Sequence, residues 1–332
     1  MSYPWLDEAE QQFMRSLTDG RMAHAILVGG PGGLGKLEFA NRAARTLMCL
    51  ERNGMEQGFR AECHCRSCQL MGSGAHPDFR LLTFEENEKT HKMRTELVVE
   101  QVRGLSASMQ LTNSLSPYKV AIVHPAEAMN RSTANALLKT LEEPPGDSVL
   151  FLVSHDPSRL PQTIRSRCQK LPVRIPDLAV ARNWLVQQGV SEAASADRAL
   201  LAAAGRPLTA LQMTQDGRAD QFQEVGKLLA RASGNENAID EIVEACARLE
   251  PTDLWTWISL IAARRVRQRF APSTEGQKSI ERPGRPPGGG STHQLARLQM
   301  LADGNRLALS TQLRKDLLLR DWLIQWSRIA TD

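Results

Sequence analysis

A glycine-rich loop near the amino terminus constrains the fold of this 332-residue chain more than any other feature. A short apolar segment, Ala25–Val28, runs into Gly-Gly-Pro-Gly-Gly-Leu-Gly-Lys, and residues 37–50 then carry apolar side chains at helical spacing. Strand, glycine loop and helix in this order are typical of a phosphate-binding loop, whose backbone N–H groups and helix start attract an anion. The residues that would face a phosphate are Gly30, Gly32, Gly33, Gly35 and Lys36.

The position after Lys36 decides the metal chemistry of such a loop. It normally holds Ser or Thr, whose hydroxyl binds Mg²⁺. Here it holds Leu37, which has no atom that can ligate a metal ion. Two interpretations stay open: the loop still binds a nucleotide, or it persists only as an element of the fold.

A second part of a phosphate-loop ATPase site is also altered. An acidic pair is expected at the end of a later strand, where it holds Mg²⁺ and polarises water. The strand predicted at Val120–Val123 is followed instead by His124 and Pro125. An imidazole is a poor Mg²⁺ ligand beside oxygen donors, and proline offers no side-chain base. We interpret Glu127, two residues further on, as a solvated carboxylate at a helix start, so hydrolysis in this cleft is not expected.

The first half of the chain alternates between two kinds of segment. Besides the two strands above, residues 80–84 and 149–153 read as strands, the latter without polar interruption, as in buried parallel strands. Residues 98–109 and 130–143 carry the helical pattern, and Pro144 must end the second. This alternation predicts an α/β domain with a parallel sheet covered by helices over residues 1–170.

The second half predicts only helices. We expect a small helical lid domain over residues 171–214 and an all-α collar domain over residues 215–332. Within the collar, residues 271–293 are rich in Pro, Gly, Ser and charge, which predicts a mobile loop.

Composition adds weaker constraints. Lys and Arg number 41 against 37 Asp and Glu, and this net charge of +4 does not by itself indicate nucleic-acid binding. An apolar run of about 18 residues, as a membrane span requires, is absent from the sequence. The acidic start lacks the apolar core of a signal peptide, so we expect a cytoplasmic protein.

Two further motifs carry a resemblance to a known family. The run Asn-Ala-Leu-Leu-Lys-Thr-Leu-Glu-Glu-Pro-Pro at residues 135–145 resembles clamp-loader ATPases of the AAA+ superfamily, and so does Ser166-Arg167-Cys168. With the glycine loop and a cysteine cluster, these motifs cover about residues 20–170. The resemblance implies an AAA+ phosphate-loop domain, then a helical lid and a helical collar. The active ATPase subunits of this family keep the Mg²⁺ ligands and its delta-prime branch typically lacks them, so the sequence resembles that branch.

The resemblance also implies a function and partners. Such a chain would be a non-hydrolysing stator in a hetero-pentamer with the gamma/tau ATPase and delta subunits. This clamp loader serves the DNA polymerase III holoenzyme and loads the sliding clamp onto primed DNA. The family places the arginine of Ser166-Arg167-Cys168 at a neighbour's γ-phosphate, which makes Arg167 a candidate trans arginine finger. The alternative is a surface or ion-paired arginine. Arg206, at a predicted helix start, would either touch nucleotide or be solvated.

Four cysteines lie within twenty residues, which in a reducing compartment favours a structural zinc site over disulfides. They are Cys49, Cys63, Cys65 and Cys68. The family carries zinc here with C-x-x-C-x-x-C spacing, whereas this chain has C-x-C-x-x-C, so Cys63 and His64 are alternative ligands. Free thiols remain the other interpretation. Cys168 is expected to be a small buried residue.

Two other functions are weighed against this one. An active gamma/tau-like ATPase subunit would turn over nucleotide, and a zinc-dependent DNA-binding module would bind DNA with a steep salt dependence. The basic run of residues 264–269 would contact either DNA phosphate or another subunit. Four tryptophans at helical spacing are expected to pack in the helical core, namely Trp255, Trp257, Trp322 and Trp326.

Overall fold

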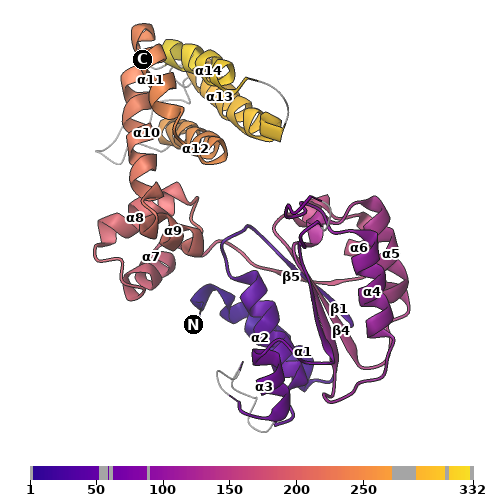
Figure 1. The fold of residues 1–332 in the computed structure, drawn as a ribbon. Coiled ribbons are helices and arrows are strands. Elements are labelled where there is room, and N and C mark those ends of the chain that lie inside the picture. Colours follow the sequence, from indigo (N-terminus) through magenta and orange to yellow (C-terminus); the bar gives the residue numbers. More distant parts are fainter. Residues whose placement is uncertain are drawn as a thin grey trace, which may run out of the picture. The chain divides into compact units, whose positions relative to one another are not determined.

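The computed structural model describes residues 3–51, 59, 63–87, 90–270, 289–310 and 314–329. The chain divides into two compact units (Figure 1). The first comprises residues 1–188 and 205–209, and the second comprises residues 189–204 and 210–332. The lid and collar boundaries predicted at 171–214 and 215–332 stay a prediction.

A five-stranded parallel sheet forms the centre of the first unit. Its order is β2-β3-β4-β1-β5. The strands are β1 (Ala25–Gly29), β2 (Phe79–Leu82), β3 (Lys119–Val123), β4 (Ser148–Ser154) and β5 (Gln169–Pro172). The three central strands are buried along their whole length, which explains their uninterrupted apolar sequences.

The strand register brings three loops to one edge of the sheet. Gly29 at the end of β1 is paired with Ser154 at the end of β4, and Val123 at the end of β3 is paired with Leu152. Parallel neighbours end at the same edge, and ligands of open α/β sheets bind outside these carboxyl ends. The glycine loop, His124 and His155 therefore meet there.

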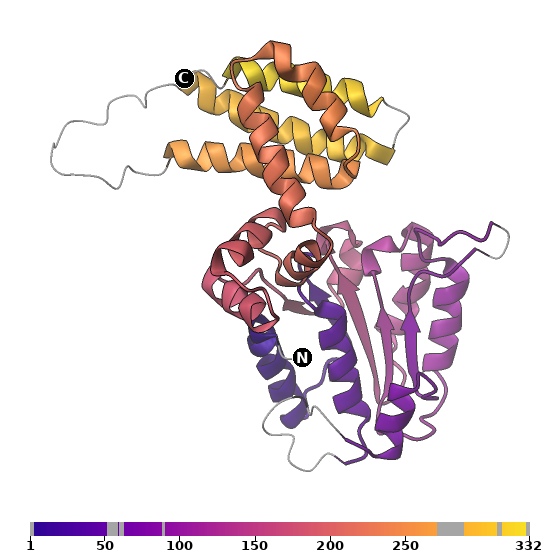
Figure 2. The ribbon, with the colours of Figure 1, turned by 60° about the vertical axis from the view of Figure 1, so that its left-hand side comes forward.

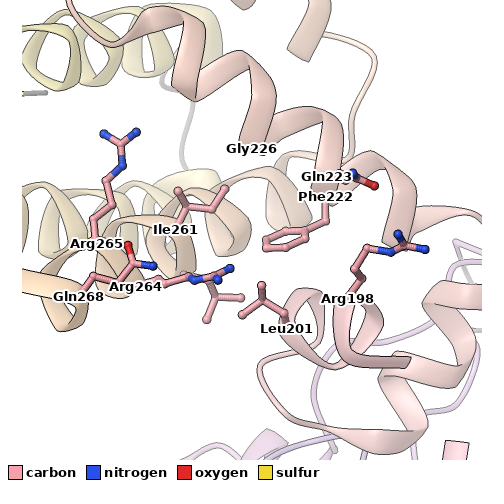
Figure 3. A pocket seen from close by; sticks show the side chains of 10 residues that line it. Arg198, Leu201, Phe222, Gln223, Gly226, Ile261, Arg264, Arg265 and Gln268 are labelled. Atoms are coloured by element: carbon pink, nitrogen blue, oxygen red, sulfur yellow. The ribbon is translucent and has the colours of Figure 1, made fainter. Parts of the chain in front are cut away.

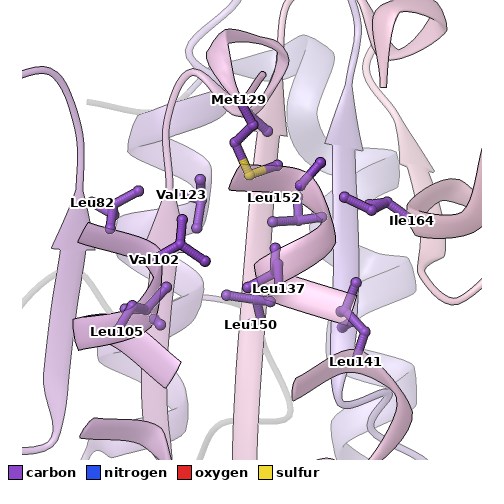
Figure 4. Packing of buried hydrophobic residues seen from close by; sticks show 14 of the residues in the cluster. Leu82, Val102, Leu105, Val123, Met129, Leu137, Leu141, Leu150, Leu152 and Ile164 are labelled. Atoms are coloured by element: carbon purple, nitrogen blue, oxygen red, sulfur yellow. The ribbon is translucent and has the colours of Figure 1, made fainter. Parts of the chain in front are cut away.

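Helices cover both faces of this sheet (Figure 1). Those of the first unit are α1 (Asp7–Thr18), α2 (Lys36–Met48), α3 (Arg66–Gly72), α4 (Val99–Met109), α5 (Arg131–Glu142), α6 (Gln162–Arg165) and α7 (Leu178–Gln187). On one face, α4, α5 and α6 pack on the strands through a single apolar cluster that includes Leu105, Leu137, Leu152 and Ile164 (Figure 4). On the other, Phe13 of α1 and Phe39 of α2 meet edge to face, and Phe13 also meets Phe151 of β4.

The described residues of the second unit form helices and the turns that connect them (Figure 2). Its helices are α8 (Ala193–Ala202), α10 (Arg218–Ala232), α11 (Ile239–Cys246), α12 (Pro251–Phe270), α13 (Gly289–Leu307) and α14 (Lys315–Ile329), and α9 (Pro207–Gln215) contributes residues to both units. The core position predicted for the four tryptophans is confirmed, since all are buried. Trp322 and Trp326 stack at 5.0 Å, and their indole N–H groups donate to the carbonyls of Leu298 and Leu229.

The sequence pattern missed two elements that matter for the site. Strand β5 reads Gln-Lys-Leu-Pro and lies at the edge of the sheet, where it pairs with β1 and buries mainly Leu171, so it lacks a strand-like apolar run. Helix α1 lies in the acidic start of the chain, where only Ala9, Phe13 and Met14 are buried.

The segment predicted as a mobile loop at 271–293 lies mostly outside the described residues. Helix α13 begins at Gly289, however, so the last five residues of that prediction are helical. The helix is held by Leu295, Leu298 and Ala302, which are buried at helical spacing. In the described part of the chain, no helix is both long and apolar enough for a bilayer span.

Candidate functional site

The glycine loop joins β1 to α2 and is shaped by its own neighbours. Gly33 and Gly35 have φ angles of 73° and 78°, a region that disfavours other residues. Neither has room for a side chain: a Cβ on Gly33 would lie 2.0 Å from Thr209 Oγ1, and one on Gly35 would lie 2.6 Å from the Tyr3 ring. Because these two positions carry no side chain, Thr209 and Tyr3 of the same chain can pack directly against the loop.

An aromatic turn at the amino terminus covers this loop. The Trp5 indole N–H donates to the Leu34 carbonyl at 2.9 Å, and the Tyr3 and Trp5 rings stack at 5.4 Å. Trp184 of α7 meets both rings edge to face. Sequence reasoning missed this cover, for which the only local signal was the Tyr-Pro-Trp run.

Lys36 is held inside the cleft. Its ammonium donates to the Pro31 carbonyl at 2.6 Å and lies 3.1 Å from Nδ1 of the His155 imidazole. Burial lowers the pKa of Lys36 to about 8, although the nearby Glu127 carboxylate acts in the opposite direction. A lysine that grips phosphate oxygens needs its charge and its N–H groups directed at the ligand, whereas this ammonium already contacts two groups of its own chain.

His124, His155 and Glu127 fill the place where Mg²⁺ ligands are expected. The two imidazole rings meet edge to face with centroids 5.2 Å apart. Glu127 Oε1 accepts the backbone N–H of His155 at 2.9 Å, and Glu127 Oε2 is buried without a hydrogen-bond partner among the described residues. Glu127 lies at the start of the short 3₁₀ turn Ala126–Ala128, as predicted, and its side chain is half-buried. The prediction of a solvated carboxylate is wrong for the buried Oε2 only.

The electrostatics of this cleft differ from those of a metal site. Burial lowers the pKa of His124, and burial, Lys36 and Arg206 lower that of His155, so both rings tend to be neutral near pH 7. Mg²⁺ demands near-octahedral oxygen coordination. Leu37, His124 and Pro125 supply no side-chain oxygen, so among these positions and Glu127 only the Glu127 carboxylate offers side-chain oxygens, which is too few for such coordination. The cleft is arranged as an internal contact network. Arg206 lies near enough to His155 to affect its titration.

The arginine of the Ser-Arg-Cys motif lies just after α6. Its Nη1 donates to the Thr163 carbonyl at 3.0 Å, and its Nη2 lies 2.7 Å from Glu142 Oε1 at the end of α5. The Arg167 side chain is 37% exposed. Cys168 is buried, as predicted, and burial raises its thiol pKa to about 11. Arg167 is thus ion-paired within its own chain and still accessible from outside.

The structure brings the four clustered cysteines together. Their sulfur atoms all lie within 4.8 Å of one another. Cys49 directly follows α2, and Cys65 is the N-cap of α3, where its sulfur accepts the backbone N–H of Cys68. His64 is exposed, and among the described residues the group that could hold a metal ion contains Cys63 in its place.

Neighbouring groups hold the cysteine loops in place. Ser67 donates to the Met48 carbonyl at 2.7 Å and lies 3.0 Å from His76 Nε2, and Arg45 donates to the Cys68 carbonyl. Burial raises the pKa of Cys49 and Cys68. Burial also acts to raise that of Cys65, but hydrogen bonds, first that of the Cys68 N–H, outweigh it and lower the pKa.

The basic run of the second unit lines a separate cavity of about 410 Å³ (Figure 3). Arg264 and Arg265 of α12 and Arg198 of α8 surround an apolar floor that includes Phe222. Arg198 donates to Ser195, and the Arg265 guanidinium lies 4.3 Å from the centre of the Trp326 ring. Part of this basic run is therefore engaged in packing within the helical unit.

Comparisons with known proteins point to one family. Residues 5–177 match the family described as "DNA polymerase III, delta subunit". The DNA polymerase III subunit delta' of Pseudomonas aeruginosa is 35% identical over 98% of this chain and 98% of its own length. That of Escherichia coli K12 is 32% identical over 79% of this chain and 70% of its own. A solved gamma-subunit-related protein from Thermotoga maritima is 15% identical, with a TM-score of 0.49, over 96% of this chain and 99% of that chain. The sequence matches carry the family assignment.

The contacts of Lys36 predict a pH-dependent effect on stability. Its pKa is about 8 in the folded chain and near 10.5 when exposed, so between these values the unfolded chain binds more protons. The free energy of unfolding of the wild type should therefore rise between pH 7 and pH 10 relative to Lys36→Met, by up to about 3 kcal/mol. Urea unfolding at several pH values measures this difference. The exposed Lys139→Met serves as the control and should run parallel to wild type; parallel curves for Lys36→Met would show that Lys36 is not buried as described.

Proposed function

Because this chain belongs to the family of DNA polymerase III delta' subunits, we propose that it serves the clamp loader without hydrolysing ATP in its own cleft. The observation that carries this proposal is the contact network of the cleft. Lys36 binds Pro31 and His155, and the positions of the Mg²⁺ ligands hold Leu37, His124 and Pro125. The glycine loop then acts as a structural element, and the chain acts as a rigid stator.

The cover of the loop supports a further part of the proposal, that ATP does not bind. Tyr3 and Thr209 occupy the space beside Gly35 and Gly33, and Trp5 binds the Leu34 carbonyl. A nucleotide would have to displace these contacts and draw Lys36 away from its internal acceptors. Neither change is compensated by a bound Mg²⁺, since the cleft offers too few oxygen ligands.

The proposed partners are the gamma/tau ATPase and delta subunits, with which the chain forms a hetero-pentamer in the cytoplasm. Through this complex it helps to load the sliding clamp onto primed DNA. The relatives named delta' and one named tau, from Salmonella typhimurium and 33% identical over 51% of this chain, support a place among such subunits.

Within the ring, we assign to Arg167 the role of a trans arginine finger. Arg167 directly follows the short helix α6 and its C-cap Ser166, and its side chain is partly exposed, as a group that must reach a neighbour requires. An arginine supplied in trans stabilises the charge that develops on the transferred phosphoryl group. In GTPases, such fingers accelerate hydrolysis by several orders of magnitude.

The finger role predicts a loss of activity at a neighbour's site. Arg167→Ala in the reconstituted complex should lower DNA-stimulated ATP hydrolysis by at least about tenfold at the site that receives the finger, since fingers are worth about 10³–10⁵ in rate. Single-turnover phosphate release measures this loss, as a slow phase that the wild-type complex lacks. Arg159→Ala changes another exposed arginine of the same unit, so it is the matched control and should behave as wild type. Unchanged hydrolysis by Arg167→Ala would refute the finger role.

The alternatives have less support. An active gamma/tau-like subunit needs Mg²⁺ ligands that Leu37, His124 and Pro125 do not provide. A DNA-binding module would need free basic groups, whereas Arg198 and Arg265 contact their own chain.

We also propose that the four cysteines hold a structural Zn²⁺. Zinc–sulfur bonds of about 2.3 Å place the sulfurs of a tetrahedral site about 3.8 Å apart. Cys49 Sγ lies 3.5 Å from Cys63 Sγ and 3.9 Å from Cys65 Sγ, so the described geometry fits such a site. Four thiolates leave no open position for water, and the bound ion would fix the loop between α2 and α3.

The zinc site predicts a metal content. Purified full-length chain should contain about one zinc ion, and Cys68→Ser should lose most of it, because a structural site needs all four ligands. Inductively coupled plasma mass spectrometry provides the measurement. Cys246→Ala, a buried cysteine of the second unit, should keep its zinc. A wild type without zinc, or a Cys68→Ser variant that retains it, would count against this assignment.

A further inference from the structure

The ion pair between Arg167 and Glu142 links two separate parts of the family motifs. Glu142 is the last residue of α5, within the Leu-Glu-Glu-Pro-Pro run, and Arg167 follows α6. Arg167 Nη2 lies 2.7 Å from Glu142 Oε1, and Arg167 Nη1 donates to the Thr163 carbonyl at 3.0 Å. The guanidinium is thus held from two sides, by a side chain and by a backbone carbonyl.

The backbone on both sides of this contact is anchored in the core. Leu141, directly before Glu142, is buried, and so are Ile164 and Cys168 on either side of Arg167. All three belong to the same apolar cluster, in which Leu141 and Ile164 extend from α5 and α6 (Figure 4). Only the two long side chains are therefore free to change conformation, and the contact between them determines where the guanidinium lies.

The arginine keeps capacity for another acceptor. A guanidinium carries five N–H donors, and the contacts with Glu142 and Thr163 use two of them. A phosphate oxygen can therefore be bound while both contacts persist. The side chains of Arg167 and Glu142 are 37% and 49% exposed, so the pair is open to a partner.

From this geometry we infer that Glu142 is a positioning residue for Arg167, one that orients the guanidinium toward the neighbouring subunit's phosphate. The inference rests on the proposed finger role of Arg167. Arginine has a large side-chain entropy, and holding it in one orientation reduces what is lost when it meets the phosphate. The carboxylate opposes this gain by repelling a phosphate, but at an exposed site this repulsion is screened by water and salt.

A latch is the opposite possibility for the same contact. If Glu142 sequestered Arg167, the pair would have to break before hydrolysis, and removing the carboxylate charge would accelerate ATP turnover. The unused N–H donors and the exposure of the pair favour positioning, because neither contact has to break.

The test compares Glu142→Gln with Glu143→Gln in the complete reconstituted clamp loader. Both variants remove one carboxylate charge from adjacent exposed residues, but only Glu142 contacts Arg167. Glu142→Gln should lower the single-turnover rate at the site that receives Arg167 about two- to fivefold, the effect expected of an exposed ion pair. KM for ATP should not change, because a finger acts mainly in the transition state. Glu143→Gln should match wild type.

A combined variant separates positioning from a purely structural effect. In an Arg167→Ala background, Glu142→Gln should have no additional effect. The positioning role would be refuted if Glu142→Gln lowered the rate further in that background. It would also be refuted if Glu142→Gln alone left the rate unchanged or made it faster. In each of these cases the finger role of Arg167 would stand. An unchanged rate with Arg167→Ala itself would refute the proposed finger, and the positioning of it as well.

Discussion

The contact of the Lys36 ammonium with the Pro31 carbonyl and the His155 imidazole determines what the glycine loop of this protein can do. In a phosphate-binding loop, the lysine and the backbone N–H groups are free to bind the phosphate oxygens. Here the Lys36 ammonium already contacts groups of its own chain. Its burial disfavours the charged form, and the pKa of Lys36 is lowered for this reason. His155 in turn donates its backbone N–H to Glu127. These contacts tie Lys36 and His155 to groups of their own chain, while Glu127 Oε2 is buried without a hydrogen-bond partner among the described residues.

The parallel sheet explains how a chain can keep the architecture of an ATPase without the residues that hold Mg²⁺. The ends of β1, β3 and β4 still meet at one edge, so the loop glycines and His124 lie where a nucleotide site would be. On one face of the sheet, the apolar cluster anchors α5 and α6 and therefore both partners of the Arg167–Glu142 pair. The same sheet thus supports both the cleft that holds Lys36 and the partly exposed Arg167.

Much of this was accessible from sequence because the decisive losses are local. Leu37 follows the loop lysine directly, and His124 and Pro125 follow a recognisable buried strand, so both could be identified by position. The partners of these residues could not. His155 is 119 positions from Lys36, and only the pairing of β1 with β4 brings it near. Tyr3 reaches the loop from a turn whose residues carry no periodic pattern. The sequence pattern did not predict strand β5, because an edge strand needs few apolar residues and β5 buries only Leu171.

The account depends on a cleft that neither holds Mg²⁺ nor activates water. Its most direct test is the rate at which the purified chain, without its partners, releases phosphate from ATP in the presence of Mg²⁺. We expect no release above that of a Lys36→Ala variant prepared in the same way, because the wild-type lysine contributes nothing to hydrolysis. Sustained turnover by the wild-type chain that is abolished by Lys36→Ala would contradict the account, since it would show that this cleft is a working ATPase site.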